Sequence, residues 1–153
     1  MILGLGSDLT DIRRIERGMA RFGARFVTRI FTENERQRAE ALAVALRPAF
    51  YAKRFAAKEA CAKALGTGFA KGVTWRDFDT MNGTAGRPVL HVTGVAARRL
   101  MDLTPAGMAA RIHVTLSDAY PFALAVVILA AVPSSETLTI LKKAIDSIPE
   151  TCY

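Results

Sequence analysis

The spacing of hydrophobic residues changes along the chain between the period of a strand and the period of a helix. The first run, Ile2 to Ser7, is short and apolar and ends in glycine and serine, so it predicts a β-strand. Asp8 or Thr10 then suits the N-cap of a helix. Apolar residues recur at helical spacing within that helix, at Ile12, Ile15, Met19 and Phe22. The chain is therefore expected to open as a strand followed by an amphipathic helix.

The next region predicts two more helices, and the second of them is the most apolar helix of the chain. Thr32 and Glu35 form a capping box that opens a helix reaching about Leu46. Pro48 fits the first turn of the following helix, which we expect to end at about Leu65. Apolar residues occupy most sides of it, at Phe55, Ala56, Ala57, Ala60, Cys61 and Ala64. This helix should be central and largely buried.

The second half of the chain has mostly the patterns of strands. We expect a strand at 75–80, a turn at 82–88, a returning strand at 89–92, a helix at 93–103, and a hairpin of strands at 112–117 and 122–131. After Pro133 the composition changes, and residues 134–148 predict a polar helix with Leu138, Leu141 and Ile145 on one side. We therefore divide the chain into a domain at 1–132 and a C-terminal helical appendage at 133–153, for which the sequence indicates no role.

Composition adds a strong positive charge to this picture. The chain has 153 residues and a net charge of +7, and most of the surplus lies in residues 1–63. Such a charge favours an acidic partner, which leaves nucleic acid, an anionic membrane, a phosphate-rich cofactor and an acidic protein as possibilities. The two cysteines, Cys61 and Cys152, lack metal-ligand spacing, and residues 1–6 do not resemble a signal peptide. We therefore expect a cytoplasmic protein.

Two carboxylates are the strongest candidates for chemistry. Asp8 alone would be explained as a helix cap, and Glu59 alone as half of a surface ion pair with Lys63 at i+4. However, Lys58, Glu59 and Lys63 are charges on a largely apolar helix, where burial is costly unless they serve a ligand. Oxygen ligands suit Mg²⁺, and neighbouring cations suit the phosphates that it bridges. The glycines after this helix, Gly66 and Gly68, are explained equally well as a C-cap.

Two polar stripes leave both a structural and a functional interpretation open. Arg14, Arg17, Arg21 and Arg25 form one stripe, which is either a solvated helix face or a dock for an acidic macromolecule. His113, Thr115 and Ser117 alternate along a predicted strand and so share one side of the sheet. That side is either simply exposed or contacts phosphate.

Five segments together resemble holo-[acyl-carrier-protein] synthase, the small bacterial type of 4′-phosphopantetheinyl transferase. They are Gly6-Ser7-Asp8-Leu9 with Arg14, Phe31 to Glu35, Arg54 to Gly68, Gly86-Arg87-Pro88, and His113 to Ser117. The resemblance covers about residues 1–132. It implies an α+β fold, in which an antiparallel sheet packs on a long central helix. It also implies a homotrimer with sites between subunits.

The resemblance further implies an activity and a set of site residues. Such enzymes transfer the phosphopantetheine group of coenzyme A to a serine of apo acyl carrier protein, for fatty acid biosynthesis, and release adenosine 3′,5′-bisphosphate. Asp8 and Glu59 would bind Mg²⁺, and the resemblance gives Glu59 and Lys63 catalytic roles. Residues expected to contact coenzyme A are Arg54, Lys58, Lys63, Gly66, Gly86, Arg87, Pro88, His113 and Thr115. The carrier would dock on Arg14, Arg17, Arg21 and Arg25.

One departure from the family pattern concerns the proton acceptor. Asp118 stands where the family often has a histidine, and Thr115 stands where a serine is usual. Glu59, Asp118 and a metal-bound water are all candidates for the base. Two rival functions are a basic nucleic-acid-binding module and a metal-independent coenzyme A acyltransferase. We expect neither nucleic acid nor a membrane as the partner.

Overall fold

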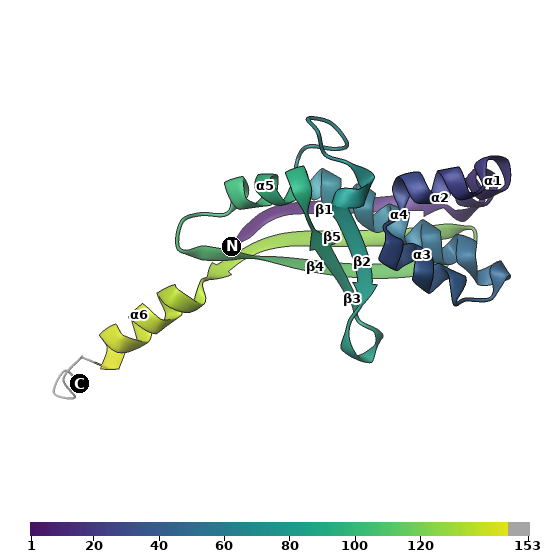
Figure 1. Ribbon diagram of the computed structural model, residues 1–153. Helices are drawn as coiled ribbons and strands as arrows, with labels where there is room; N and C mark the ends of the chain where they lie inside the picture. The colour runs from purple at the N-terminus through teal and green to yellow at the C-terminus, as the bar shows by residue number, and fades with distance from the viewer. Residues whose placement is uncertain (147–153) are drawn as a thin grey trace.

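A three-stranded antiparallel sheet packed on one long helix forms the centre of the fold (Figure 1). The structure is a computed structural model that describes residues 1–146. The sheet has the order β1-β5-β4, and its strands are β1 (Ile2–Asp11), β4 (Met108–Ala119) and β5 (Phe122–Pro133). A separate antiparallel pair consists of β2 (Phe78–Asn82) and β3 (Pro88–Val92). The expected α+β fold is confirmed.

Six α-helices accompany this sheet within residues 1–146. They are α1 (Ile12–Phe22), α2 (Ala24–Ile30), α3 (Glu33–Glu40), α4 (Arg47–Ala64), α5 (Gly94–Leu103) and α6 (Ser135–Asp146). Short 3₁₀ turns lie at Val44–Leu46, Trp75–Asp77 and Thr84–Gly86. Figure 1 shows α1, α2 and α3 clustered at one end and α5 at the other, with α4 against the sheet.

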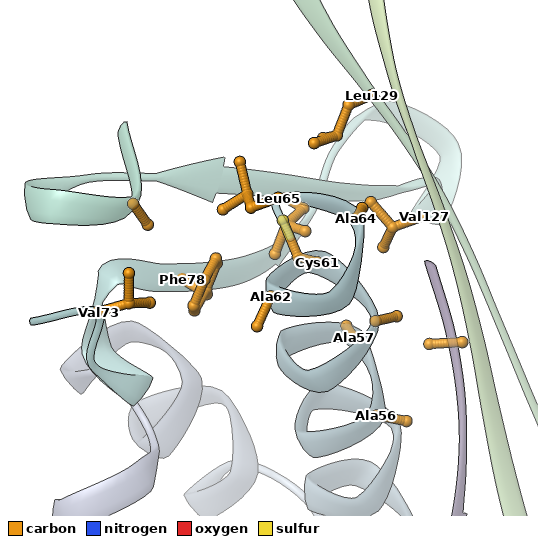
Figure 2. Packing of buried hydrophobic residues seen from close by; sticks show 14 residues of the cluster. Ala56, Ala57, Cys61, Ala62, Ala64, Leu65, Val73, Phe78, Val127 and Leu129 are labelled. Carbon is orange, nitrogen blue, oxygen red and sulfur yellow. The ribbon is translucent and has the colours of Figure 1, made fainter. Parts of the chain in front are cut away.

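Helix α4 is the central, buried helix that the sequence predicts. Most of its buried side chains are small, and they contact Val127 and Leu129 of β5 and Phe78 of β2 (Figure 2). Burial raises the pKa of the Cys61 thiol to about 12, so this cysteine packs as a small apolar residue. Because the helix is lined with alanine, the sheet can approach it closely.

The closest approach is between β1 and α4, and it depends on two glycines. A Cβ atom on Gly6 would overlap the carbonyl oxygen of Ala60, and one on Gly4 would overlap that of Ala64. Only a residue without a side chain fits at either position. Gly4, Gly6 and Asp8 alternate along β1, so all three face α4.

Several predicted boundaries are wrong for local reasons. Strand β1 continues through Asp8 and Thr10 to Asp11, and the Asp11 carboxylate caps α1 by accepting the Arg13 N–H. Gly23, at φ 55°, separates α1 from α2, so Arg25 lies on a different helix from Arg14. Residues 75–77 form a 3₁₀ turn ahead of strand β2.

Two further boundaries concern α1 and α3. Helix α3 has the predicted capping box but ends at Glu40 rather than near Leu46. The Arg47 guanidinium closes the turn that follows by donating to the backbone oxygens of Glu40 and Leu42. Phe22, expected on the apolar stripe of α1, is 54% exposed, whereas Ile12 and Ile15 are buried.

The C-terminal helix α6 leads away from the sheet (Figure 1). Ser134 accepts the Thr137 N–H at its first turn, and the Thr137 hydroxyl donates to the Gly107 oxygen. Residues 147–153, which include the end of the predicted helix and Cys152, lie outside the described residues. Among residues 1–146, no helix combines the length and the apolar character needed to cross a membrane.

The close approach of β1 to α4 leads to a stability prediction. Gly6→Ala should lower the free energy of unfolding by roughly 1–3 kcal/mol, because the methyl group meets rigid backbone rather than a movable side chain. Ser7→Ala, on the opposite side of the strand, should change it by less than about 0.5 kcal/mol. Urea denaturation of both variants measures this, and equal stabilities would show that β1 can move away from the helix without cost.

Candidate functional site

Asp8, Lys63 and Glu59 meet where β1 crosses the C-terminal half of α4. The Lys63 ammonium lies 2.8 Å from Asp8 Oδ1 and 3.0 Å from the backbone oxygen of Ser7. The other oxygen of Asp8 accepts the Thr10 hydroxyl at 2.7 Å. Glu59 lies one turn before Lys63 on the same helix. The two carboxylates that the sequence selected, 51 positions apart in number, are therefore neighbours in space.

The electrostatics of Glu59 show how close these groups are. Partial burial raises the pKa of Glu59, the negative charge of Asp8 raises it further, and the charges of Lys63 and Arg14 oppose both effects. Two carboxylates that repel each other in this way are stabilised by a cation between them. Within residues 1–146, no cluster of three or more His, Cys, Asp or Glu side chains is placed to hold a metal. A two-carboxylate site matches Mg²⁺, which commonly takes one or two carboxylates together with substrate phosphates.

A cavity of about 960 Å³ opens between α3, α4, the β2–β3 turn and β4. Arg38, Lys53 and Arg54 supply positive charge to its wall, and Gly86 and Pro88 form part of the turn side. Asp118 also lines the cavity, where the Lys53 ammonium binds its carboxylate at 2.6 Å. Gly86 and Pro88 of the turn and Lys53 and Arg54 of α4 thus face the same space.

Arg54 is built into the wall of this cavity rather than free on its surface. It is 3% exposed, donates to Asn82 Oδ1 at 2.9 Å, and stacks on the Phe50 ring with its guanidinium carbon 3.5 Å from the centroid. Burial lowers its pKa to about 10, and its buried Nε has no hydrogen-bond partner. Because the guanidinium lines the cavity and is held in a fixed position, its positive charge is suited to attract an anion there.

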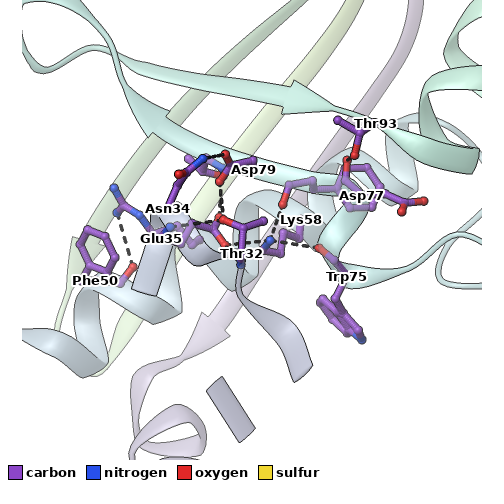
Figure 3. Close-up of polar contacts among 12 residues, drawn as sticks. Thr32, Asn34, Glu35, Phe50, Lys58, Trp75, Asp77, Asp79 and Thr93 are labelled. Carbon is purple, nitrogen blue, oxygen red and sulfur yellow. Dashed lines mark hydrogen bonds and ion pairs between the residues drawn. The ribbon is translucent and has the colours of Figure 1, made fainter. Parts of the chain in front are cut away.

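Lys58 requires a correction. The sequence-based prediction has it contacting phosphate, but its side chain is fully buried and its ammonium has three acceptors inside the protein. These are Glu35 Oε2 at 2.9 Å, the Trp75 oxygen at 3.0 Å and the Phe78 oxygen (Figure 3). With every donor used, Lys58 ties α4 to α3 and to the start of β2.

Glu35 completes this buried network and was not expected to do so. Its carboxylate accepts the N–H of Thr80 at 3.0 Å and of Thr32 at 3.0 Å, besides pairing with Lys58. The Thr32 hydroxyl and the Asn34 amide both donate to Asp79 of β2 (Figure 3). The sequence showed only the capping-box role of Glu35, because pairing with residues 23 to 45 positions later is not visible in local spacing.

His113 and Thr115 lie on the other side of the sheet from α4. Both are exposed, as is Ser117, while the intervening Ile112 and Val114 turn toward the core. Strand β5 separates β4 from β1. Within one chain, the structure therefore does not bring His113 or Thr115 together with Asp8 and Glu59.

Gly66 follows the end of α4 in a left-handed conformation, at φ 71°. Its N–H donates to the Lys63 oxygen, and the N–H groups of Thr67 and Gly68 donate to the Ala62 oxygen. This is how a helix C-terminus is capped, so the structural interpretation explains the glycines fully. Contact between Gly66 and coenzyme A stays a prediction.

The arginine stripe is split between two grooves. Arg14, Arg17 and Arg21 lie along a groove of about 670 Å³ on α1. Arg25 lies instead with Arg29 beside an apolar groove of about 530 Å³, which Phe22, Phe26, Ile30 and Trp75 also line. All four predicted arginines are exposed, and the exposed Phe22 lies between the two groups.

Comparison with known proteins identifies the family of this chain. A sequence model of the 4′-phosphopantetheinyl transferase superfamily matches residues 4–125. The holo-[acyl-carrier-protein] synthase of Methylobacterium nodulans is 57% identical over 133 residues, which cover 87% of this chain and 99% of that protein. The one from Brucella ovis is 54% identical over 136 residues, covering 89% and 100%.

Solved structures give the same result. The holo-[acyl-carrier-protein] synthase of Neisseria meningitidis superposes with a TM-score of 0.72 at 33% identity, covering 85% of this chain and 99% of that one. The enzyme of Bacillus anthracis, solved in complex with coenzyme A (3′,5′-ADP), gives 0.68 at 36% identity, covering 84% and 96%. The chain belongs to the 4′-phosphopantetheinyl transferase superfamily. The family resemblance inferred from the sequence is confirmed.

The buried Glu35–Lys58 pair leads to a second prediction. Lys58→Met should lower the free energy of unfolding by roughly 3–5 kcal/mol, because it leaves the Glu35 carboxylate buried without its counter-charge. Adding Glu35→Gln removes that stranded charge, so the double variant should lose less than the sum of the two single variants. Exposed Lys142→Met serves as a control, and strictly additive losses in urea denaturation would contradict the direct pairing.

Proposed function

We propose that this protein transfers the 4′-phosphopantetheine group of coenzyme A to a serine of apo acyl carrier protein and releases adenosine 3′,5′-bisphosphate. The observation that carries the proposal is the meeting of Asp8, Glu59 and Lys63 at one point of the fold. The names of the relatives support the acceptor, and the coenzyme A complex of the Bacillus anthracis enzyme supports the donor. The attacking serine belongs to the carrier, so this chain needs no nucleophile of its own.

Asp8 and Glu59 are the residues that would hold Mg²⁺. Both present carboxylate oxygens, and their mutual repulsion favours a cation. When bound, Mg²⁺ would neutralise charge that develops on the pyrophosphate of coenzyme A. Lys63 adds a second positive charge from the same helix. Phosphoryl transfer depends mainly on such positioning and charge neutralisation, so these residue types suffice.

The cavity beside Arg54 is the proposed place for the nucleotide end of coenzyme A. Arg38, Lys53 and Arg54 line this cavity and would bind phosphate oxygens there. Gly86 and Pro88 would contact the adenine, as the family resemblance implies, with Arg87 in the same turn. Lys58 was expected to bind phosphate but does not line the cavity. Lys53 and Arg38 do line it, and we propose that they bind phosphate instead.

Glu59 and Asp118 are the two carboxylates of this chain proposed as the proton acceptor. Partial burial and the charge of Asp8 raise the pKa of Glu59 in the free protein, whereas a metal ion bound to Glu59 would lower that pKa. Asp118 is held instead in an ion pair with Lys53, at the cavity wall. We therefore do not assign proton removal from the carrier serine to either carboxylate.

The outer face of the sheet supports a homotrimer with sites between subunits. This outer face, on the side away from α4, includes Leu5, Leu9, Phe122 and Leu124, which are 41–65% exposed. Exposed apolar surface of this extent on a sheet indicates a protein interface. His113 and Thr115 lie on this face at the free β4 edge, whereas Asp8 and Glu59 lie at the β1 side. Packing of copies through this face would let one copy's His113 complete the site of another.

The acidic carrier would dock on the arginines of α1. Arg14, Arg17 and Arg21 are exposed in one groove and carry a single sign of charge, which attracts an acidic helix. Arg25 and Arg29 continue the positive surface on α2. We propose, as the resemblance implies, that the carrier is that of fatty acid biosynthesis and that the reaction takes place in the cytoplasm.

The activity itself is the direct test. Incubating the protein with apo acyl carrier protein, coenzyme A and Mg²⁺ should add the mass of one phosphopantetheine group to the carrier. Glu59→Gln should lower the rate roughly 10²-fold or more, because a metal ligand that neutralises charge contributes several kcal/mol to the barrier. Exposed Glu136→Gln, on α6, is the matched control. A carrier of unchanged mass, by mass spectrometry, would exclude the proposed reaction.

The proposed assembly has its own test. Leu124→Lys places a charge in the middle of the outer face and should convert the assembly to single chains, with loss of activity. Leu138→Lys makes the same change at an exposed position of α6 and should leave the assembly intact. Light scattering coupled to gel filtration measures both. A Leu124→Lys protein with the mass of the unaltered assembly would show that subunits associate through another surface.

A further inference from the structure

Lys63 contacts Asp8, one of the two carboxylates that would bind the metal ion. Its ammonium is bound by two oxygens of β1, the backbone oxygen of Ser7 at 3.0 Å and Asp8 Oδ1 at 2.8 Å. The second Asp8 oxygen accepts the Thr10 hydroxyl at 2.7 Å. Both oxygens of Asp8 therefore already have a donor, and one of these donors carries a full positive charge.

We propose that Lys63 is a built-in counter-ion, which must leave Asp8 before Mg²⁺ binds and which then pairs with the pyrophosphate of coenzyme A. This inference rests on the proposed function, because it needs the metal site and the coenzyme A site described above. It assigns to Lys63 a role in the free protein, in addition to charge neutralisation during transfer. Lys63 then links the two ligands energetically.

The two lysines of α4 differ in whether they can move. Lys58 is fully buried with three acceptors, so it has no route to another partner. The Lys63 side chain is 49% exposed and ends a flexible four-carbon stem, and ion pairs at such exposure are weak. Rotation about its side-chain bonds can therefore carry the ammonium from Asp8 to a nearby phosphate without moving the helix.

Displacement of Lys63 makes the binding of metal and coenzyme A mutually favourable. Metal alone has to break the Asp8 ion pair and leaves Lys63 facing water, next to a second cation. Coenzyme A gives Lys63 a new partner and frees Asp8, so metal binds more tightly when the pyrophosphate is present. By linkage, metal must strengthen coenzyme A binding by the same factor.

Direct metal titration tests the first part without reference to turnover. Mn²⁺ replaces Mg²⁺ as a paramagnetic probe for oxygen ligands, and electron paramagnetic resonance counts the free ion as the full-length protein is titrated. In the absence of coenzyme A, Lys63→Met should bind Mn²⁺ at least about fivefold more tightly than the unaltered protein, the lower range of ordinary coupling factors. Lys142→Met removes the same charge from exposed α6 and should bind as the unaltered protein does. Thermal melts followed by circular dichroism verify that both variants are folded.

Repeating the titration with saturating coenzyme A tests the link between the ligands. The tightening of Mn²⁺ by coenzyme A should be larger in the unaltered protein than in Lys63→Met, where only the direct contact between metal and phosphate remains. Asp8→Asn should weaken Mn²⁺ binding both in the unaltered protein and when it is combined with Lys63→Met.

Two results would overturn the inference, and they differ in what they leave standing. In one result, Lys63→Met and the unaltered protein bind Mn²⁺ equally, and adding Asp8→Asn to either protein weakens Mn²⁺ binding. The metal site then stands and the counter-ion role of Lys63 is wrong. If none of these proteins binds Mn²⁺ with or without coenzyme A, the metal dependence in the proposed function fails as well.

Discussion

The contact between the glycines of β1 and the alanines of α4 positions the rest of the structure. Gly4 and Gly6 bring the strand backbone directly onto the carbonyl groups of Ala64 and Ala60. Asp8 follows Gly6 on the same side of the strand, and Glu59 and Lys63 flank the same alanines on the helix. The distance between strand and helix therefore sets the distance between the three charged groups. A larger residue at Gly6 would separate them as well as cost stability.

A second group of interactions holds the middle of α4 in place. Lys58 and Glu35 form a fully buried pair that joins α4 to α3 and β2, and Arg54 stacks against Phe50 on the cavity wall. Buried charges of this kind are costly to desolvate, so they are retained only where several partners satisfy them. Their effect here is geometric, because they fix the cavity beside the β2–β3 turn. The same helix thus carries the proposed metal site and one wall of the proposed nucleotide site.

A single chain keeps two groups of the predicted site residues apart. His113 and Thr115 face away from α4, and the sheet they share has an exposed apolar surface. Because β5 lies between β4 and β1, no rotation of side chains can bring His113 to Asp8 within one chain. The proposed assembly of copies through the sheet would explain both the exposed face and the separation of His113 from Asp8. This is why the oligomeric state and the activity are linked in the proposed function.

Local pattern was sufficient for the elements and for the residue types of the site. Helical periodicity, the Thr32–Glu35 capping box and Pro48 predicted α1, α3 and α4. Charges on an apolar helix singled out Glu59 because their burial needs a reason, and the family resemblance gave Asp8 a role beyond that of a helix cap. The extents of β1 and α3 were wrong because hydrogen bonds from Arg13 and Arg47 decide where they end. Only the tertiary structure showed that Lys58 forms a buried ion pair with Glu35 and that Lys63 forms an ion pair with Asp8. It also showed that Arg38 and Lys53 line the same cavity as Arg54. Those facts depend on pairing between residues far apart in the chain, and local spacing carries no record of such pairing.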